Sequence, residues 1–328
     1  MEYKRLGHTG LKVSRLILGT MNFGELTDEK TAFAIMDRAL EAGINTFDTA
    51  DVYGGPQSPD MKQGFGKSEE IVGRWLQKTG NRQRIVLATK GYQPMGLGVN
   101  DRGLSAYHLR QAVAASLRRL QTDHIDLYQM HHIDSQTSWA EIWSTMTQLQ
   151  QSGQIIYVGS SNFAGWNIAT AQKEAEERHL LGLASEQSLY NLSNRALELE
   201  VIPALRYYQI GLIVWSPIGM GLLAGNFDQS SHGRRRTADL EGQIQVHQQQ
   251  LAEYQDLCRQ IGEEPSVVAL AWLLQNPVVT APITGPRTVE QLDKSLHALD
   301  VQLSPDVLQR LDKIWPGPGG PAPQAYAW

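Results

Sequence analysis

The chain has 328 residues, with 29 lysines and arginines against 34 aspartates and glutamates and a formal net charge of -5. This balance argues against nucleic-acid binding, because no basic surface is available for phosphates, and no window approaches the roughly 18 uncharged residues of a membrane span. A single cysteine, Cys258, excludes an intrachain disulfide and a cysteine-based metal cluster. We therefore expect a cytoplasmic protein without a membrane partner, and we expect Cys258 to be a packing residue.

Short runs rich in Ile, Val and Leu alternate with longer amphipathic segments along the whole chain. Parallel strands joined by crossover helices produce this alternation, so the predicted fold class is α/β. Strands are expected at residues 16–20, 44–48, 85–90, 125–131, 155–160, 183–187, 212–215 and 279–283. Helices are expected at residues 28–42, 68–77, 105–120, 138–151, 194–208 and 288–298, several of them after a Ser, Thr, Asp or Asn cap.

Eight such repeats predict a (β/α)8 TIM barrel that forms a single domain over residues 1–328. A Rossmann fold loses its main support, because no G-x-G-x-x-G motif follows the first predicted strand. Three long loops interrupt the repeat, at residues 51–67, 91–104 and 216–242, and we expect them on the active face. Residues 315–328 form a Pro/Gly-rich tail that cannot be helical, and we expect it over the barrel mouth or another surface.

Four polar side chains stand at or just after predicted strand ends, namely Asp48, Tyr53, Lys90 and His131. The carboxyl ends of barrel strands build the active site of this fold, so the four are predicted to form one proton-transfer site. Each one alone has an ordinary explanation as a loop cap, a packed aromatic, a solvated strand end or a core histidine. Their joint occurrence favours the site.

The order of motifs is similar to that of the aldo-keto reductase family. The motifs that carry the resemblance are LGTM at 18–21, NTFDTA at 45–50 with Tyr53, GKSEE at 66–70, ATK at 88–90, DLYQMH at 126–131, GSSNF at 159–163, EQ at 186–187 with YN at 190–191, WSP at 215–217 and GPRT at 285–288 with Gln291. The match runs over nearly the whole chain and resembles the bacterial, potassium-channel β-subunit-like branch. It implies reduction of a small aldehyde or ketone with NADP(H) held on the barrel.

The chemistry of carbonyl reduction assigns a role to each of the four residues. Negative charge develops on the carbonyl oxygen, so Tyr53 is the predicted general acid. An ammonium about 4 Å away is worth roughly 4 kcal/mol, which would lower the tyrosine pKa by up to about 3 units. Lys90 is predicted to supply this ammonium, with Asp48 fixing it and cancelling part of its effect. The resemblance implies that His131 binds the substrate oxygen, and strand alternation predicts that His132 points the other way.

The resemblance also implies a cofactor site. Its predicted members are Gly19, Thr20, Met21, Asp48, Ser161, Asn162, Gln187, Trp215, Ser216, Pro217, Gly219, Gly221, Leu223, Arg234, Gly285, Arg287, Gln291 and Ser295. We expect the backbone N–H groups of Gly219, Gly221 and Leu223 to approach the pyrophosphate. A guanidinium at Arg287 suits a 2′-phosphate and favours NADPH over NADH. The arginines at 234–236 either close over the phosphates or are solvated.

The predicted substrate-binding residues are Phe23, Tyr53, Tyr92 and His131, and no metal ligands are expected. The tail resembles that of bacterial members that reduce nucleotide-linked keto-deoxysugars, which leaves such a sugar as an alternative substrate. A cofactor-binding regulatory module like the channel β subunits is the alternative function; we expect such a module to carry an extra targeting segment, and this sequence starts almost directly at Tyr3. A metal-dependent hydrolase ranks last, since it needs several histidines at strand ends. The exterior is compatible with a monomer or a homo-oligomer.

Overall fold

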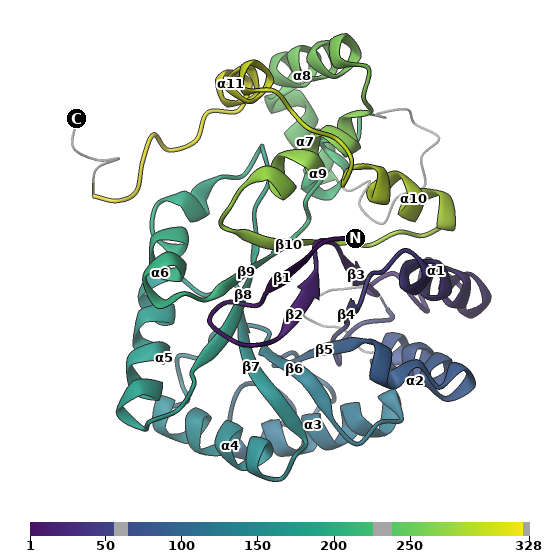
Figure 1. Ribbon diagram of the computed structural model, residues 1–328. Coiled ribbons are helices and arrows are strands. Elements are labelled where there is room, and N and C mark those ends of the chain that lie inside the picture. Colours follow the sequence, from purple (N-terminus) through teal and green to yellow (C-terminus); the bar gives the residue numbers. More distant parts are fainter. Residues whose placement is uncertain (56–64, 226–237, 324–328) are drawn as a thin grey trace.

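Eight parallel strands close into one barrel in the computed structural model, which describes residues 1–55, 65–225 and 238–323 (Figure 1). Around the barrel the strand order is β10-β3-β4-β5-β6-β7-β8-β9. The strands are β3 (Ile17–Gly19), β4 (Thr46–Asp48), β5 (Val86–Gly91), β6 (Ile125–Met130), β7 (Ile155–Ser161), β8 (Leu183–Leu189), β9 (Gly211–Trp215) and β10 (Val279–Thr284). All eight predicted strands are confirmed, each within two residues of its expected ends, and so is the predicted (β/α)8 barrel.

Helices surround the barrel on its outer side (Figure 1). They are α1 (Glu29–Glu41), α2 (Lys67–Thr79), α3 (Ala106–Leu120), α4 (Trp139–Gln151), α5 (Gly165–Glu177), α6 (Val201–Tyr208), α9 (Pro265–Gln275) and α10 (Val289–His297). The long connection from β9 to β10 adds α7 (Ala238–Val246) and α8 (Gln248–Ile261), and α11 (Pro305–Ile314) follows α10. Short 3-10 turns lie at η1 (Asn81–Arg84), η2 (Ala196–Glu198) and η3 (Gly219–Gly221).

The predicted helix caps hold the helix starts in place. The side chains of Asp28, Ser105, Ser138 and Thr288 each accept a hydrogen bond from the backbone N–H three residues later. Each cap satisfies one of the N–H groups that a helix start leaves without an intrahelical partner. Cys258 lies on α8 and is buried in the core between barrel and helices, as expected of a packing residue.

The predicted helix over residues 194–208 is wrong in its first half. Only η2 forms there, and α6 begins at Val201. Pro203 explains the difference, because its ring lacks an N–H and clashes with the carbonyl four residues earlier, so proline fits only the first turn of a helix. The carbonyl of Leu199 instead accepts a hydrogen bond of 2.9 Å from the backbone N–H of Ala322 in the tail.

A hairpin that the sequence patterns do not predict closes one end of the barrel. Strands β1 (Tyr3–Arg5) and β2 (Lys12–Ser14) pair antiparallel in front of the barrel in Figure 1. Leu6 and Val13 on this hairpin pack into the same buried cluster as barrel residues such as Ile17 and Ile213. The hairpin therefore covers the amino ends of the strands and leaves the carboxyl ends for a site.

The described part of the tail, residues 315–323, contains no helix or strand, as its composition predicts. It passes along the connection between β8 and α6, where the guanidinium of Arg195 donates to the backbone carbonyl of Trp315 at 3.1 Å. Tyr326 and Trp328 lie outside the described residues. The tail thus rests on a flank of the barrel as far as Pro323.

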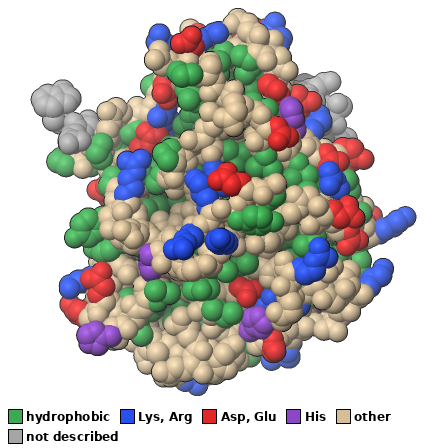
Figure 2. Space-filling model, in the orientation of Figure 1, with side chains coloured by type: hydrophobic (Ala, Val, Ile, Leu, Met, Phe, Trp, Pro, Cys, Tyr) green, Lys and Arg blue, Asp and Glu red, His purple; other side chains and the backbone are tan. Residues whose placement is uncertain are grey.

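Charges of both signs are interspersed on the face shown in Figure 2, in keeping with the small net charge of -5. No helix among the described residues has both the length and the apolar character needed to cross a membrane.

Candidate active site

Four predicted catalytic residues meet at the carboxyl end of the barrel. Asp48 ends β4, Lys90 lies on β5, His131 follows β6, and Tyr53 lies in the connection between β4 and α2. The Nζ atom of Lys90 is 2.6 Å from Oδ2 of Asp48 and 3.3 Å from Oη of Tyr53. The rings of Tyr53 and His131 meet edge to face, with centroids 5.8 Å apart. The barrel thus brings together side chains that are far apart in sequence.

The ammonium of Lys90 has three hydrogen-bond acceptors, one for each of its protons. They are Oδ2 of Asp48, Oη of Tyr53, and the backbone carbonyl of Thr49 at 2.9 Å. Burial by itself lowers the pKa of Lys90, but the charges of Asp48 and Tyr53 outweigh it, so that the pKa lies above its ordinary value. Lys90 is therefore charged and donates to the phenol oxygen of Tyr53.

The second carboxylate oxygen of Asp48 is held by two amides. Oδ1 accepts hydrogen bonds of 2.9 Å from Nε2 of Gln129 and 2.9 Å from Nε2 of Gln187. The sequence reasoning missed Gln129. In the parallel register of β5 and β6, Gln129 is the partner of Lys90, which places it beside the Asp48–Lys90 pair.

His131 and His132 do not point in opposite directions, and this expectation is wrong. Their rings stack with centroids 5.2 Å apart and an interplanar angle of 14°. Strand alternation does not apply because β6 ends at Met130, one residue before the pair. Burial, then the ammonium of Lys90, then His132 hold the pKa of His131 well below its usual range, so the imidazole is neutral near pH 7.

The predicted cofactor residues at the ends of β7 and β9 lie in one hydrogen-bonded group. The indole N–H of Trp215 donates to Oδ1 of Asn162 at 3.0 Å, and Nδ2 of Asn162 donates to Oγ of Ser161 at 3.0 Å. Ser216 follows Trp215, and its carbonyl accepts from Nδ2 of Asn191 at 3.0 Å. Pro217 is buried beside them. These contacts hold the Trp215 and Asn162 side chains together at the barrel end.

The expected phosphate contacts of residues 219–223 are not formed by free N–H groups. The N–H of Gly219 donates to the carbonyl of Ser216, and those of Gly221 and Leu223 donate to the carbonyl of Ile218. The 3-10 turn η3 uses these donors internally, and the side chain of Leu223 is fully buried. Arg234 lies outside the described residues.

The remaining predicted cofactor residues lie around β3, β10 and the start of α10. Gly19 and Gly285 are near neighbours, and a side chain on Gly19 would clash with Ile283, so the close approach of β3 and β10 requires this glycine. Gln291 accepts from the backbone N–H of Arg287 at 2.8 Å, and Ser295 bonds the hydroxyl of Thr284 at 2.8 Å. Thr20 is buried and accepts from the hydroxyl of Ser68 at 2.7 Å.

The predicted substrate residues do not all lie at the site. Tyr92 is half-buried, and its ring meets His132 with centroids 5.4 Å apart. Met21 packs in a small cluster with Tyr53. Phe23, by contrast, is fully buried in the core between barrel and helices, so the expectation that it lines the substrate site is not met. The connection after β3 directs the Phe23 side chain into the core between barrel and helices, and the residue type alone does not predict this direction.

Two buried acidic groups lie close to the catalytic residues. Glu186 precedes Gln187 on β8 and accepts hydrogen bonds from the hydroxyls of Ser160 and Ser188 and from the N–H of Phe163. Burial raises the pKa of Glu186 to about 7. Asp51 donates its N–H to the carbonyl of Lys90 at 3.1 Å, while neither of its carboxylate oxygens has a hydrogen-bond partner among the described residues.

The charge environment of Asp51 is also acidic. Glu69 pairs with Arg119 at 2.7 Å and receives a hydrogen bond from Thr89 at 2.6 Å. Burial, and after it the carboxylate of Glu69, raise the pKa of Asp51 well above its usual range. Asp51 is therefore a neutral carboxylic acid over a wider pH range than an ordinary aspartate.

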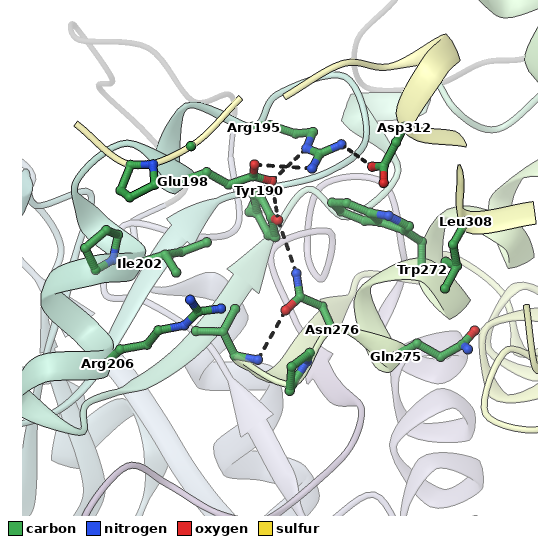
Figure 3. Close-up of a pocket in the computed structure, with 15 residues that line it drawn as sticks. Tyr190, Arg195, Glu198, Ile202, Arg206, Trp272, Gln275, Asn276, Leu308 and Asp312 are labelled. Atoms are coloured by element: carbon green, nitrogen blue, oxygen red, sulfur yellow. Dashed lines mark hydrogen bonds and ion pairs between the residues drawn. The ribbon is translucent and has the colours of Figure 1, made fainter. Parts of the chain in front are cut away.

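A separate pocket of about 430 Å³ lies on the flank of the barrel, between α6, the end of α9, α11 and the tail (Figure 3). Its walls include Trp272, Ile202 and Arg206, and Arg195 in its lining pairs with both Glu198 and Asp312. None of the four catalytic candidates lines it. Among the described residues no cluster of three His, Cys, Asp or Glu side chains is arranged to hold a metal ion.

Comparison of the sequence with known proteins identifies its family. Residues 15–316 match the model of the Aldo/keto reductase family. The chain is 52% identical to the "Uncharacterized oxidoreductase YrpG" of Bacillus subtilis (strain 168), with 100% of each chain covered. It is 33% identical to the "Versiconal hemiacetal acetate reductase" of Aspergillus parasiticus, over 95% of this chain and 96% of the other. It is 31% identical to a "Probable voltage-gated potassium channel subunit beta" of Oryza sativa subsp. japonica, over 96% of each.

Proposed function

The chain belongs to the aldo/keto reductase family, and we propose that it reduces an aldehyde or ketone to an alcohol, using NADPH, with Tyr53 as the general acid. The observation that carries the proposal is the hydrogen bonding of Lys90. All three ammonium protons have acceptors, and one acceptor is the phenol oxygen. Tyr53 accepts from Lys90 through its oxygen, so its own proton is the one that it can give to a substrate.

The proton transfer follows from these contacts. As negative charge develops on the carbonyl oxygen, the phenol of Tyr53 gives up its proton to that oxygen, and the resulting phenolate remains hydrogen-bonded to the ammonium of Lys90. Asp48 keeps this ammonium fixed from the other side at 2.6 Å. His131, a neutral imidazole, donates a hydrogen bond to the same substrate oxygen. Solvent returns the proton to Tyr53 after the product leaves.

The residues present fit a nicotinamide cofactor. The Nε2 group of Gln187 donates to Asp48 and Gln129, while its side-chain oxygen Oε1 has no hydrogen-bond partner among the described residues. A free amide acceptor at a strand end suits a carboxamide, and the nearby indole of Trp215 offers a flat face. When bound, NADPH supplies the hydride to the carbonyl carbon. Arg287 would face the 2′-phosphate, which favours NADPH over NADH.

The test of the reaction is consumption of NADPH with a panel of aldehydes, ketones and a nucleotide-linked keto-deoxysugar, comparing the wild type with Tyr53→Phe. Loss of a general acid costs about 100- to 10,000-fold in rate. The variant is expected to bind NADPH as the wild type does, because the ring is kept. Turnover of Tyr53→Phe at a near wild-type rate would refute the assignment of the proton donor.

The choice of cofactor has its own test. Replacing Arg287 with Gln removes the charge proposed to meet the 2′-phosphate, so NADPH binding is expected to weaken while NADH binding changes little. Titration of both dinucleotides against tryptophan fluorescence measures this difference. Equal affinity of the wild type for NADH and NADPH would remove the argument for NADPH.

A regulatory role is the second candidate, because the likeness to a probable potassium channel subunit beta is about as close as the likeness to the named reductase. A binding module of this kind would hold NADPH tightly and consume it slowly with every carbonyl in the panel. Saturable turnover of a carbonyl substrate that depends on Tyr53 would show that the protein acts as an enzyme and not only as a binding module.

A further inference from the structure

Gln129 is a fully buried amide in the middle of the catalytic hydrogen bonds. Its Nε2 atom donates to Oδ1 of Asp48 at 2.9 Å, and its Oε1 atom accepts from Nε2 of Gln187 at 3.0 Å. Gln187 donates in turn to the same Oδ1 at 2.9 Å. Asp48, Gln129 and Gln187 therefore form a closed triangle of hydrogen bonds, which we call the amide clamp.

The orientation of both amides follows from the chemistry of Asp48. A carboxylate only accepts hydrogen bonds, so each glutamine must turn its NH2 group toward Oδ1. Once Gln129 does this, its oxygen faces Gln187 and takes the second Nε2 proton of that residue. Gln129 thereby fixes which end of the Gln187 amide is free, and the free end is the side-chain oxygen.

The clamp also decides which oxygen of Asp48 meets Lys90. With Oδ1 held by two amide donors, the carboxylate presents Oδ2 to Nζ of Lys90 at 2.6 Å. A carboxylate without these donors is free to rotate and to share both oxygens with the ammonium. The hydrogen bond from Lys90 to Tyr53, at 3.3 Å, is the longest of the three that Lys90 makes and the easiest to lose.

We infer that Gln129 is a positioning residue of the reaction, which holds Asp48 and Gln187 so that Lys90 stays hydrogen-bonded to the proton donor. The inference rests on the proposed carbonyl reduction. Gln129 touches neither the substrate oxygen nor the proton that is transferred, and it acts through Asp48. The sequence reasoning assigned it no role.

The first test compares Gln129→Leu with Gln172→Leu. Gln172 is a matched control, because it is also a buried glutamine, on α5, and its side chain bonds the backbone of Leu181 and Leu183 away from the site. Removing a hydrogen bond to a charged group changes an equilibrium constant by about 10- to 100-fold. We expect kcat of Gln129→Leu to fall by about this factor, with KM for the carbonyl changed less than about threefold. The kcat of Gln172→Leu is expected to stay near the wild-type value.

The second test uses Gln129→Glu, in which the new carboxyl group can replace the clamp only when it is protonated. In its neutral form this carboxyl group donates to Asp48 and accepts from Gln187, whereas in its ionised form it repels Asp48. The ratio of kcat between this variant and the wild type is expected to fall as pH rises from about 5 to about 8, while the ratio for Gln129→Leu stays constant. A loss that does not involve ionisation at position 129 would leave both kcat ratios constant with pH.

The denaturation midpoint of Gln129→Glu supplies a measurement that does not depend on activity. Relative to the wild type it is expected to fall over the same pH range, because ionisation places two carboxylates together. If the wild type reduces no carbonyl, the proposed function fails while this midpoint still decides on the clamp. The inference is overturned if Gln129→Leu keeps kcat within about threefold, or if neither the kcat ratio nor the midpoint difference of Gln129→Glu varies with pH.

Discussion

Glu186 gives a quantitative prediction about the pH dependence of stability. Its carboxyl group is fully buried on β8, and burial raises its pKa from 4.5 to about 7. The folded state thus binds this proton more tightly than the unfolded state, so the group stabilises the fold at low pH. That contribution is lost as pH rises between about 4.5 and about 7. At about 1.4 kcal/mol for each unit of pKa, the loss amounts to about 3 kcal/mol.

The perturbation that reveals this loss is Glu186→Gln. Glutamine resembles the protonated acid and cannot ionise. Its oxygen can accept from the hydroxyl of Ser188 and the N–H of Phe163, and its NH2 group can donate to the hydroxyl oxygen of Ser160. The free energy of unfolding of the variant, minus that of the wild type, is therefore expected to rise by about 3 kcal/mol from pH about 4.5 to pH about 7.5. All other titrating groups contribute equally to both proteins and cancel from this difference.

Urea unfolding followed by tryptophan fluorescence measures the difference at each pH. Glu176→Gln on α5 is a matched control, because Glu176 is exposed and its substitution is expected to give a difference that is flat with pH. A difference for Glu186→Gln that stays constant within about 1 kcal/mol across this range would refute the reasoning.

Three further outcomes are expected. Asp51→Asn is predicted to be more stable than the wild type near pH 7 and to lose this advantage toward pH 4, because the raised pKa of Asp51 makes burial of its ionised form costly as pH rises. Thermal denaturation midpoints of both proteins across this pH range measure the difference. A wild type that is more stable than the variant at about pH 7 contradicts the prediction. Gly91→Ala is predicted to destabilise the fold, because its new methyl group would clash with the hydroxyl of Tyr128. In the double variant, Tyr128→Phe removes this hydroxyl and should restore part of the lost stability. If the changes in denaturation midpoint of the two single variants simply add up in the double variant, the clash is not the cause. Arg195→Gln removes the ion pair with Asp312 and the hydrogen bond to the backbone carbonyl of Trp315 in the tail. A protease is therefore predicted to cleave the tail faster in this variant, while kcat hardly changes. An unchanged cleavage rate counts against this anchoring role of Arg195.

The catalytic residues show how far sequence reasoning reaches. Asp48, Lys90 and His131 stand at the ends of apolar runs, and parallel strands in a barrel end on the same face, so their meeting follows from pattern alone. The strands themselves are equally readable, because buried parallel strands are near-continuous apolar runs. Gln129 lies inside the same apolar run, but an isolated glutamine does not reveal its hydrogen-bond partners.

The misses share a different cause. Phe23 lies in a connection, where the chain can turn a side chain inward, and composition does not reveal this outcome. The phosphate contacts expected of Gly219, Gly221 and Leu223 stay a prediction. The late start of α6 could be predicted from Pro203. The stacking of the His131 and His132 rings could not be predicted, because β6 ends at Met130, directly before them.

The barrel, the number of its strands and the face on which the polar residues gather all follow from the order of amino acids, because hydrophobic periodicity and strand direction are local properties that repeat along the chain. The atoms that meet on that face are known only from the folded chain. The three acceptors of Lys90, the two amides on Asp48 and the buried acids Asp51 and Glu186 come from several different parts of the sequence. Hydrogen bonds and pKa values depend on distances of a few tenths of an ångström between such parts, which no spacing along a sequence contains.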